Sequence, residues 1–475
     1  MTNRTLEESP PMGACFTEYF RCPEHLVRLE LKGPVSGKSG YFRFGEGVTC
    51  YGRLNGEHPA PRPGLASPDV LKEVEADNDI VRLPFDLAEA VNALRCEIYT
   101  DEEKDTASSF SLLSEVYYLM RPLLPVAIRK RLQKLYLRNW RKITFPSWPV
   151  DSSVDTLMER LLMLQIRAAK LQRMPFVWFW PEGASGCAIM THDVETEVGR
   201  DFCPALMDID DSFGLKASFQ VVPEIRYEVL PQFLAAIRQR GFEVVVHDLN
   251  HDGHLYRTRE QFLERAPKIN AYGKQFGADG FRAGILYRRQ QWYEAFDFAY
   301  DMSVPNMAHL DPQRGGCCTV LPFFIGNILE IPVTTTQDYS LFNILNEHSI
   351  DLWKQQTELI LGKHGLLSFI IHPDYIIAPR ERALYEELLA HIVRLKKERN
   401  VWATTPGEVN RWWRQRAKMR LVERDGKWRI EGDGAERAGI AYAQEKNGRL
   451  EFTMDENGGS MPSSRLAQIA DRVRL

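Results

Sequence analysis

The sequence lacks three features that would assign its class at once: paired cysteines, long apolar runs and an excess of charge of one sign. No C-x-x-C pair occurs among the eight cysteines of the 475-residue chain, so neither a zinc knuckle nor a disulfide framework is indicated. We expect reduced thiols in a reducing compartment. The 60 basic and 64 acidic residues leave a formal net charge of -4, which gives no global attraction for nucleic acid.

Membrane-spanning and secretory signals are also missing. No apolar run approaches the roughly 18 residues that a spanning helix needs. The first 20 residues show no basic region followed by an apolar one, as a secretory signal would. We therefore expect a cytoplasmic protein. Its 44% hydrophobic content is ordinary for globular proteins, and its length is compatible with about three domains.

The first part, residues 1–147, is predicted to be an N-terminal α+β domain. A Gly/Pro-rich stretch at 56–68 is typical of a loop, and the pattern over 83–99 predicts a helix followed by a short strand. Residues 125–143 combine helical apolar spacing with seven Lys and Arg residues. This basic amphipathic helix has two interpretations. It makes peripheral contact with the inner face of an anionic membrane, or it packs on its own domain and exposes its basic side to solvent.

Residues 148–413 alternate short apolar runs with helical segments. Helices are predicted from a cap at Asp151 or Ser152, and over 231–241, which has Pro at its start and Gly at its end. A capping box is predicted at Thr258 and Gln261. Alternation of this kind predicts an α/β fold with parallel strands, either a barrel or an open sheet. The buried strands are expected at 187–193, 215–222, 242–248 and 366–372.

The last part, residues 414–475, changes to apolar and polar alternation. Asp425-Gly426 and Asn447-Gly448 lie where hairpin turns are expected. We predict a small C-terminal antiparallel β appendage.

The polar residues of interest follow the apolar runs of three predicted strands. Parallel α/β folds place their sites at the carboxyl ends of strands. His247 and His251 are four residues apart, so one helical turn would point both imidazoles the same way, as a shared metal requires. That spacing alone is a weak signal. Asp193 and Glu195 strengthen it, because alternation along an extended chain points them to one side.

Two imidazoles and one carboxylate leave positions open on a metal ion for water and substrate. In their order and spacing, D-x-E at 193–195, H-x-x-x-H at 247–251, a later Arg and a late His resemble the polysaccharide deacetylase (NodB-like) family. The resemblance covers about 187–406 and implies a distorted (β/α) barrel.

The resemblance also implies roles for individual residues. Glu195, His247 and His251 would hold one divalent transition metal, with zinc favoured, and Asp193 would be the general base. Arg282 would keep this base ionised, and His372 would be the general acid. An aspartate that orients the acid would be Asp301, with Asp297 as an alternative.

The sequence departs from the commoner pattern of the family at several positions. The acids of THDVE are separated, Asp248 stands where Ser or Thr is usual, and RAGI replaces R-P-P-Y. These differences leave open the contacts to substrate and the oxyanion donor, for which the N–H of Ile285 is one candidate. Trp292 and Tyr293 would favour sugar stacking, but such aromatics are more often core residues.

We therefore expect a metal-dependent hydrolase of carbon–nitrogen bonds, acting on an N-acetylated sugar of a glycan or glycan precursor. An amidohydrolase of a small non-sugar amide is the alternative among enzymes. A catalytically inactive protein that binds glycan or serves as a scaffold is the third interpretation. The sequence leaves the oligomeric state open.

Overall fold

The computed structural model describes residues 12–100 and 134–455, except 57 and 65. The first nine residues of the predicted basic helix, 125–133, lie outside the described residues, as does the chain after 455. Within the described parts of the chain, no helix is both long and apolar enough to cross a membrane.

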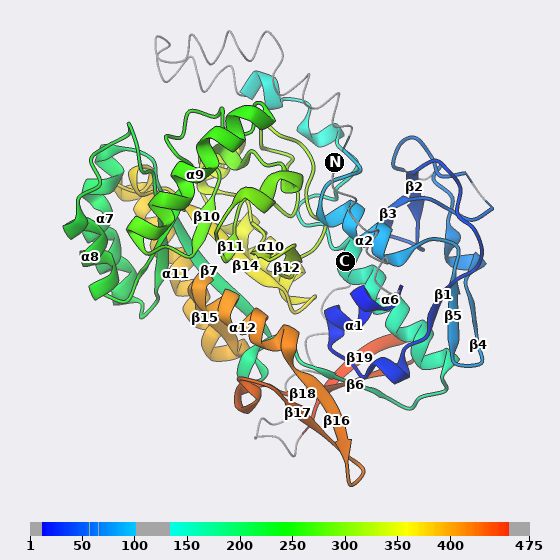
Figure 1. Cartoon of the computed structure of the whole chain (residues 1–475). Helices are drawn as coiled ribbons and strands as arrows, with labels where there is room; N and C mark the ends of the chain where they lie inside the picture. Colours follow the sequence, from blue (N-terminus) through cyan, green and yellow to red (C-terminus); the bar gives the residue numbers. More distant parts are fainter. Residues whose placement is uncertain (1–11, 57, 65, 101–133, 456–475) are drawn as a thin grey trace.

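A nine-stranded sheet forms the centre of the molecule (Figure 1). Its strands run parallel except for one antiparallel edge strand. The four buried strands predicted from the sequence are all present, which confirms the α/β class. Along the sheet the order is β12 (Phe323–Ile325), β13 (Ile328–Glu330), β11 (Tyr300–Asp301), β10 (Gly280–Arg282), β9 (Glu243–His247), β8 (Ala217–Val221), β7 (Gly186–Val194) and β14 (Leu366–Ile371), with β15 (Val401–Thr404) also paired to β7.

Helices follow the strands as crossovers and cover the sheet. The proline-initiated helix and the Thr258 cap were predicted correctly: the Thr258 side chain accepts a hydrogen bond from the N–H of Gln261. The helices are α7 (Glu197–Ser212), α8 (Pro231–Gln239), α9 (Arg259–Phe276), α10 (Asp351–Leu361), α11 (Pro379–Arg399) and α12 (Pro406–Lys418).

The barrel closes through side chains rather than through a complete strand ladder. The hydroxyl of Thr334 donates to the carbonyl of Leu366 at 2.6 Å, and that of Thr335 donates to the carbonyl of Ser368 at 2.7 Å. Both acceptors are on β14, whose free edge is thereby bonded to the segment after β13. This closure agrees with the distorted barrel that the family resemblance implies.

Strand β7 sorts its side chains onto two faces, as a period of two requires. Thr191 and Asp193 both contact Arg282 of β10. His192 points the opposite way, where its Nε2 lies 3.0 Å from Asp210 of α7. All nine residues of the strand are buried because both faces are covered.

The N-terminal part mixes short strands and helices, as predicted. The expected strand at the end of 83–99 is wrong: Cys96 to Tyr99 form a turn, in which Glu97 has a left-handed φ of 57°. The elements here are α1 (Ala14–Phe20), β1 (Leu29–Leu31), β2 (Gly40–Arg43), β3 (Thr49–Gly52), β4 (Glu75–Asp77), β5 (Ile80–Leu83), α2 (Leu87–Arg95) and α6 (Ser153–Ala168).

Both predicted C-terminal hairpins are present, β16–β17 (Arg420–Arg424 and Lys427–Glu431) and β18–β19 (Ile440–Lys446 and Arg449–Met454). Strand β18 also pairs with β6 (Met174–Val177), which no pattern in the sequence predicts. One hydrophobic core includes Phe16, Phe176 and Ala441, so it crosses the expected limits at 147 and 413. Those domain limits stay a prediction.

Candidate metal and catalytic site

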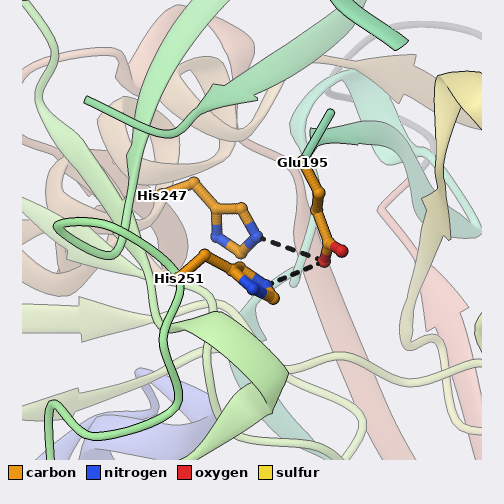
Figure 2. A group of neighbouring side chains, drawn as sticks. All are labelled: Glu195, His247 and His251. Atoms are coloured by element: carbon orange, nitrogen blue, oxygen red, sulfur yellow. Dashed lines mark ion pairs between the residues drawn. The ribbon is translucent and has the colours of Figure 1, made fainter. Parts of the chain in front are cut away.

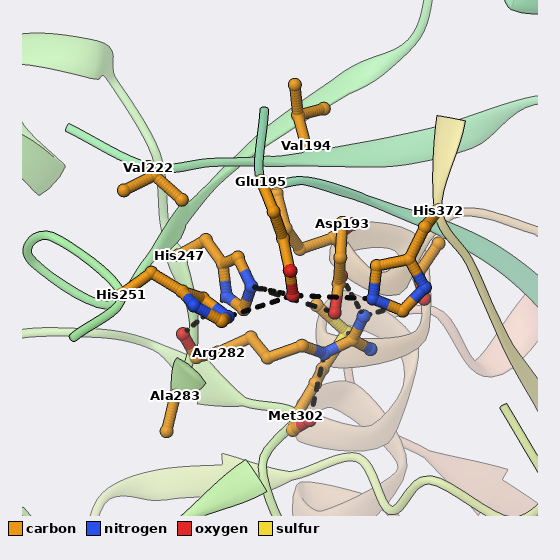
Figure 3. Close-up of polar contacts among 12 residues, drawn as sticks. Asp193, Val194, Glu195, Val222, His247, His251, Arg282, Ala283, Met302 and His372 are labelled. Atoms are coloured by element: carbon orange, nitrogen blue, oxygen red, sulfur yellow. Dashed lines mark hydrogen bonds and ion pairs between the residues drawn. The ribbon is translucent and has the colours of Figure 1, made fainter. Parts of the chain in front are cut away.

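Three strands bring the predicted site residues to the same edge of the sheet (Figure 3). Asp193 is the last residue but one of β7, and Glu195 follows that strand directly. His247 ends β9, and His372 follows β14. Parallel strands place their carboxyl ends together, so residues far apart in the sequence meet here.

Glu195, His247 and His251 form a group whose ligand atoms all lie within 4.8 Å of one another (Figure 2). Oε1 of Glu195 lies 2.8 Å from Nε2 of His251 and 3.7 Å from Nε2 of His247. Among the described residues neither Nε2 has a hydrogen-bond partner of suitable geometry, although both are buried. Buried polar atoms are normally satisfied, so these donors fit a metal ion.

The other ring nitrogen of His247 orients the imidazole. Its Nδ1 lies 3.1 Å from the carbonyl oxygen of Arg282, to which it donates as N–H. When the ring is neutral, its lone pair is then on Nε2, which faces Glu195. Histidines that bind a metal are commonly oriented in this way.

The turn that joins the two histidines is not the helical turn we expected. Asp248 and His251 have left-handed φ values of 57° and 54°, and no helix follows β9 until α9. Arg226 donates hydrogen bonds to the carbonyls of Asn250 and His251. These hydrogen bonds from the Arg226 side chain to the backbone, rather than an i,i+4 relation on a helix, bring His251 beside His247.

Asp193 pairs with Arg282 inside the barrel. Nη1 of Arg282 lies 2.6 Å from Oδ1 of the carboxylate, and Nε donates to the carbonyl of Met302 at 3.1 Å. Burial by itself would raise the pKa of Asp193, but the charge of Arg282 and then of His247 outweighs it, so the pKa lies below its usual value. The second oxygen, Oδ2, is 3.8 Å from Nε2 of His247.

His372 is held by Asp338, which corrects the expectation of Asp301 or Asp297. The Asp338 carboxylate accepts from Nδ1 of His372 at 2.6 Å and from its backbone N–H at 2.7 Å. Asp301 instead accepts from Tyr293 and Ser303, and Asp297 pairs with an exposed lysine. Asp338 belongs to no predicted strand or helix, so the sequence contained no signal for it.

Glu195 lies between the pair His247 and His251 on one side and His372 on the other. Its Oε1 is also 3.3 Å from Nε2 of His372. Burial would raise the pKa of Glu195, but His251 and His372 lower it well below its usual range. Burial would lower the pKa of His372, but Asp338 and then Glu195 raise it well above the ordinary value. The site therefore favours an ionised acid and a protonated histidine side by side.

The aromatic residues considered for sugar stacking are largely occupied in the core. Tyr293 is buried, and its hydroxyl donates to Asp301 at 2.9 Å. Trp292 is half-buried and packs against the rings of Tyr256 and Phe262. The core interpretation of these two aromatics is therefore the better one.

No family model matches the chain, and no curated protein matches it. Solved structures are similar to about half of it. A protein assigned as a polysaccharide deacetylase, from Mycobacterium smegmatis, is 17% identical over 50% of this chain and 93% of its own, with a TM-score of 0.41. The PuuE allantoinase is 14% identical over 49% and 92%, with a TM-score of 0.39.

A mutant of a pseudoenzyme of carbohydrate esterase family 4, with restored activity, is 14% identical over 48% of this chain and 68% of its own, with a TM-score of 0.32. The structural neighbours over half the chain are thus polysaccharide deacetylases, related carbohydrate esterases and an allantoinase. The contacts described above, independent of these similarities, define an α/β protein with a group of side chains that could hold a metal ion at the carboxyl edge of its sheet.

Proposed function

We propose that this protein is a metal-dependent hydrolase that removes the acetyl group from an N-acetylated sugar. One observation supports this proposal above all. Two buried imidazole nitrogens lie 2.8 and 3.7 Å from one carboxylate oxygen, and beside this group lie an acid paired with arginine and a histidine paired with aspartate. The substrate class follows from the resemblance of the sequence motifs.

The residues divide the chemistry among themselves. Glu195, His247 and His251 would hold one divalent ion, with zinc favoured. Such an ion polarises a carbonyl and lowers the pKa of water toward roughly 7. The other residues of the site would then act on protons.

Asp193 takes the proton of the attacking water, because Arg282 keeps its carboxylate ionised. The water oxygen forms the new bond to the acetyl carbon, and the bond from that carbon to nitrogen breaks. His372 donates a proton to the departing nitrogen, since an amide leaves poorly as an anion. The products are acetate and the protonated amine of the sugar, which together balance water and amide.

Asp193→Asn tests the proposal. We expect the variant to retain bound metal and to release acetate from N-acetylglucosamine oligosaccharides about 10²- to 10⁴-fold more slowly, as loss of a general base predicts. Asp208→Asn, at an exposed ion pair with Arg240, is the control and should act as the wild type does. Unchanged acetate release in Asp193→Asn, or no release by the wild type from any N-acetylated sugar, would contradict it.

A further inference from the structure

A buried ion pair joins the N-terminal part of the chain to the barrel. Glu97, just after α2, is 4% exposed, and Arg288, after β10, is fully buried. Both Nε and Nη2 of Arg288 donate to the Glu97 carboxylate, and Nε2 of Gln290 donates to it at 2.9 Å. Burial disfavours the charge of Arg288, but Glu97 outweighs this and raises its pKa.

Arg288 in turn holds the loop that precedes it. Its Nη1 donates to the carbonyl of Leu286 at 2.9 Å. Its backbone N–H donates to Oε1 of Gln313 at 3.0 Å, and its carbonyl accepts from Nε2 of the same side chain at 3.1 Å. Side chain and backbone of Arg288 are therefore both fixed.

The loop held in this way lies against the candidate site. Ile285 and Leu286 have left-handed φ values of 62° and 55°, which a β-branched residue such as isoleucine rarely adopts. A Cβ added to Gly284 would lie 2.9 Å from Cδ2 of His251 and 2.6 Å from Oδ2 of Asp248. A strained loop persists only where its surroundings determine it, and the contacts of Arg288 do so here.

A second series of contacts leads toward His372 from the segment that Arg288 contacts through Gln313. The buried Asp311 lies two residues before Gln313. Oδ1 of Asp311 accepts from Nε2 of Gln337 at 2.9 Å. The next residue, Asp338, holds the imidazole of His372. Arg288, the partner of Glu97, thus contacts the loop beside His251 and the segment that leads to Asp338.

We propose that Glu97 and Arg288 are positioning residues, through which the N-terminal part of the chain holds the loop 283–288 against the catalytic centre. The inference rests on the proposed function, because it assigns the positioned loop to that hydrolase. Neither residue touches the ligand group itself, so their effect is on the arrangement of the site. The N-terminal part is then a component of the active site and not an independent appendage.

The test replaces both charges in the full-length protein, Glu97→Met with Arg288→Met, so that neither is left buried alone. The control is Glu159→Met with Lys363→Met. It removes a partly buried ion pair of 2.5 Å between Glu159 of α6 and Lys363, which follows α10. We expect kcat for acetate release to fall at least 20-fold in the first variant, with KM changed less than threefold. The control should stay within twofold of the wild type.

Hydrogen exchange on the zinc-loaded proteins separates this proposal from the proposed function. We expect the amides of 284–290 to lose protection in the Glu97/Arg288 variant, with strands β7 and β9 unchanged. Unchanged kcat, or unchanged protection of the loop, would overturn the inference. If the wild type releases no acetate, the proposed function fails, and the exchange result alone decides whether these residues position the loop.

Arg288→Lys covers the case in which the double variant does not fold. Lysine keeps the positive charge beside Glu97. It lacks the separate donor, Nη1 of arginine, that reaches the carbonyl of Leu286. We expect this variant to fold, to lose kcat about three- to tenfold and to expose the same loop amides. Wild-type kcat and protection in Arg288→Lys would overturn the inference as well.

Discussion

Asp193 and His372 have opposite charges because their neighbours differ. Arg282 lowers the pKa of Asp193, and Asp338 with Glu195 raises the pKa of His372. The proposed reaction therefore requires a pH above the pKa of Asp193 and below that of His372. Enzymes commonly separate a general base from a general acid in this way.

At the scale of single residues, Asp338→Asn is the most informative change. Loss of its negative charge lowers the pKa of His372, so the alkaline limb of the kcat profile should shift to lower pH. We expect kcat at neutral pH to fall about ten- to a hundredfold. A pH–rate series from 5 to 10 measures both effects.

The exposed Asp297, which the sequence offered as an alternative, supplies the matched control. Asp297→Asn should leave the profile unchanged, because its carboxylate contacts Lys274 and not His372. If the alkaline limb of the kcat profile stays at the same pH in Asp338→Asn, Asp338 does not control the pKa of His372.

At the scale of elements, the parallel pair β11–β13 places Asp301 opposite Glu330. Burial and the charge of Asp301 raise the pKa of Glu330 well above its usual range. The folded state then holds a proton that the unfolded state releases. The contribution of this proton to the free energy of unfolding is complete below the ordinary pKa of a glutamate. It is lost as pH rises toward the pKa of Glu330 in the folded state, at about 1.4 kcal/mol per pH unit.

Glu330→Gln should remove that loss. Its amide can donate to Asp301 permanently, while its oxygen still accepts from the N–H of Val304, as Oε1 does at 3.0 Å. We expect the variant to be more stable than the wild type at pH 8 and similar to it near pH 5, as measured by urea unfolding. A Glu330→Gln variant that is less stable than the wild type at pH 8 would refute the retention of this proton on Glu330. The exposed Glu423→Gln is the control.

The loop after β10 gives a second prediction at this scale. Gly284→Ala would place a methyl group 2.9 Å from the ring of His251, so the imidazole has to move. We expect affinity for zinc to fall at least tenfold, since ligand geometry governs metal affinity, as measured by competition with a chelator. In Gly37→Ala the added Cβ would have no heavy atom of the described residues within 4 Å, apart from its chain neighbours. This variant should bind zinc as the wild type does. Equal affinity in both variants would contradict the packing.

The elements differ in how well their sequences predict them. Buried strands such as β9 and β14 were recognised because each is a short apolar run that ends in polar residues. The conformation of the loop at His251 was not predicted, since left-handed residues other than glycine leave no pattern in the sequence. Asp338 was missed for a related reason: only the closure of the barrel along β14 brings it to His372.

At the scale of the whole molecule, the parts of the chain depend on one another. Strand β6 pairs with β18 near the C-terminus, and the core around Phe176 includes α1. Hairpin turns at Asp-Gly and Asn-Gly made the C-terminal hairpins predictable. Their partner β6 was not, because pairing between distant segments depends on tertiary packing and not on local preference.

The proposed function requires that the protein hold one metal ion at Glu195, His247 and His251. Elemental analysis of the purified protein after dialysis against zinc measures this occupancy. We predict about one zinc per chain, lost in His247→Ala and retained in His364→Ala, whose imidazole lies outside the site. A wild type that takes up no metal, or a His247→Ala variant that retains it, would contradict the account.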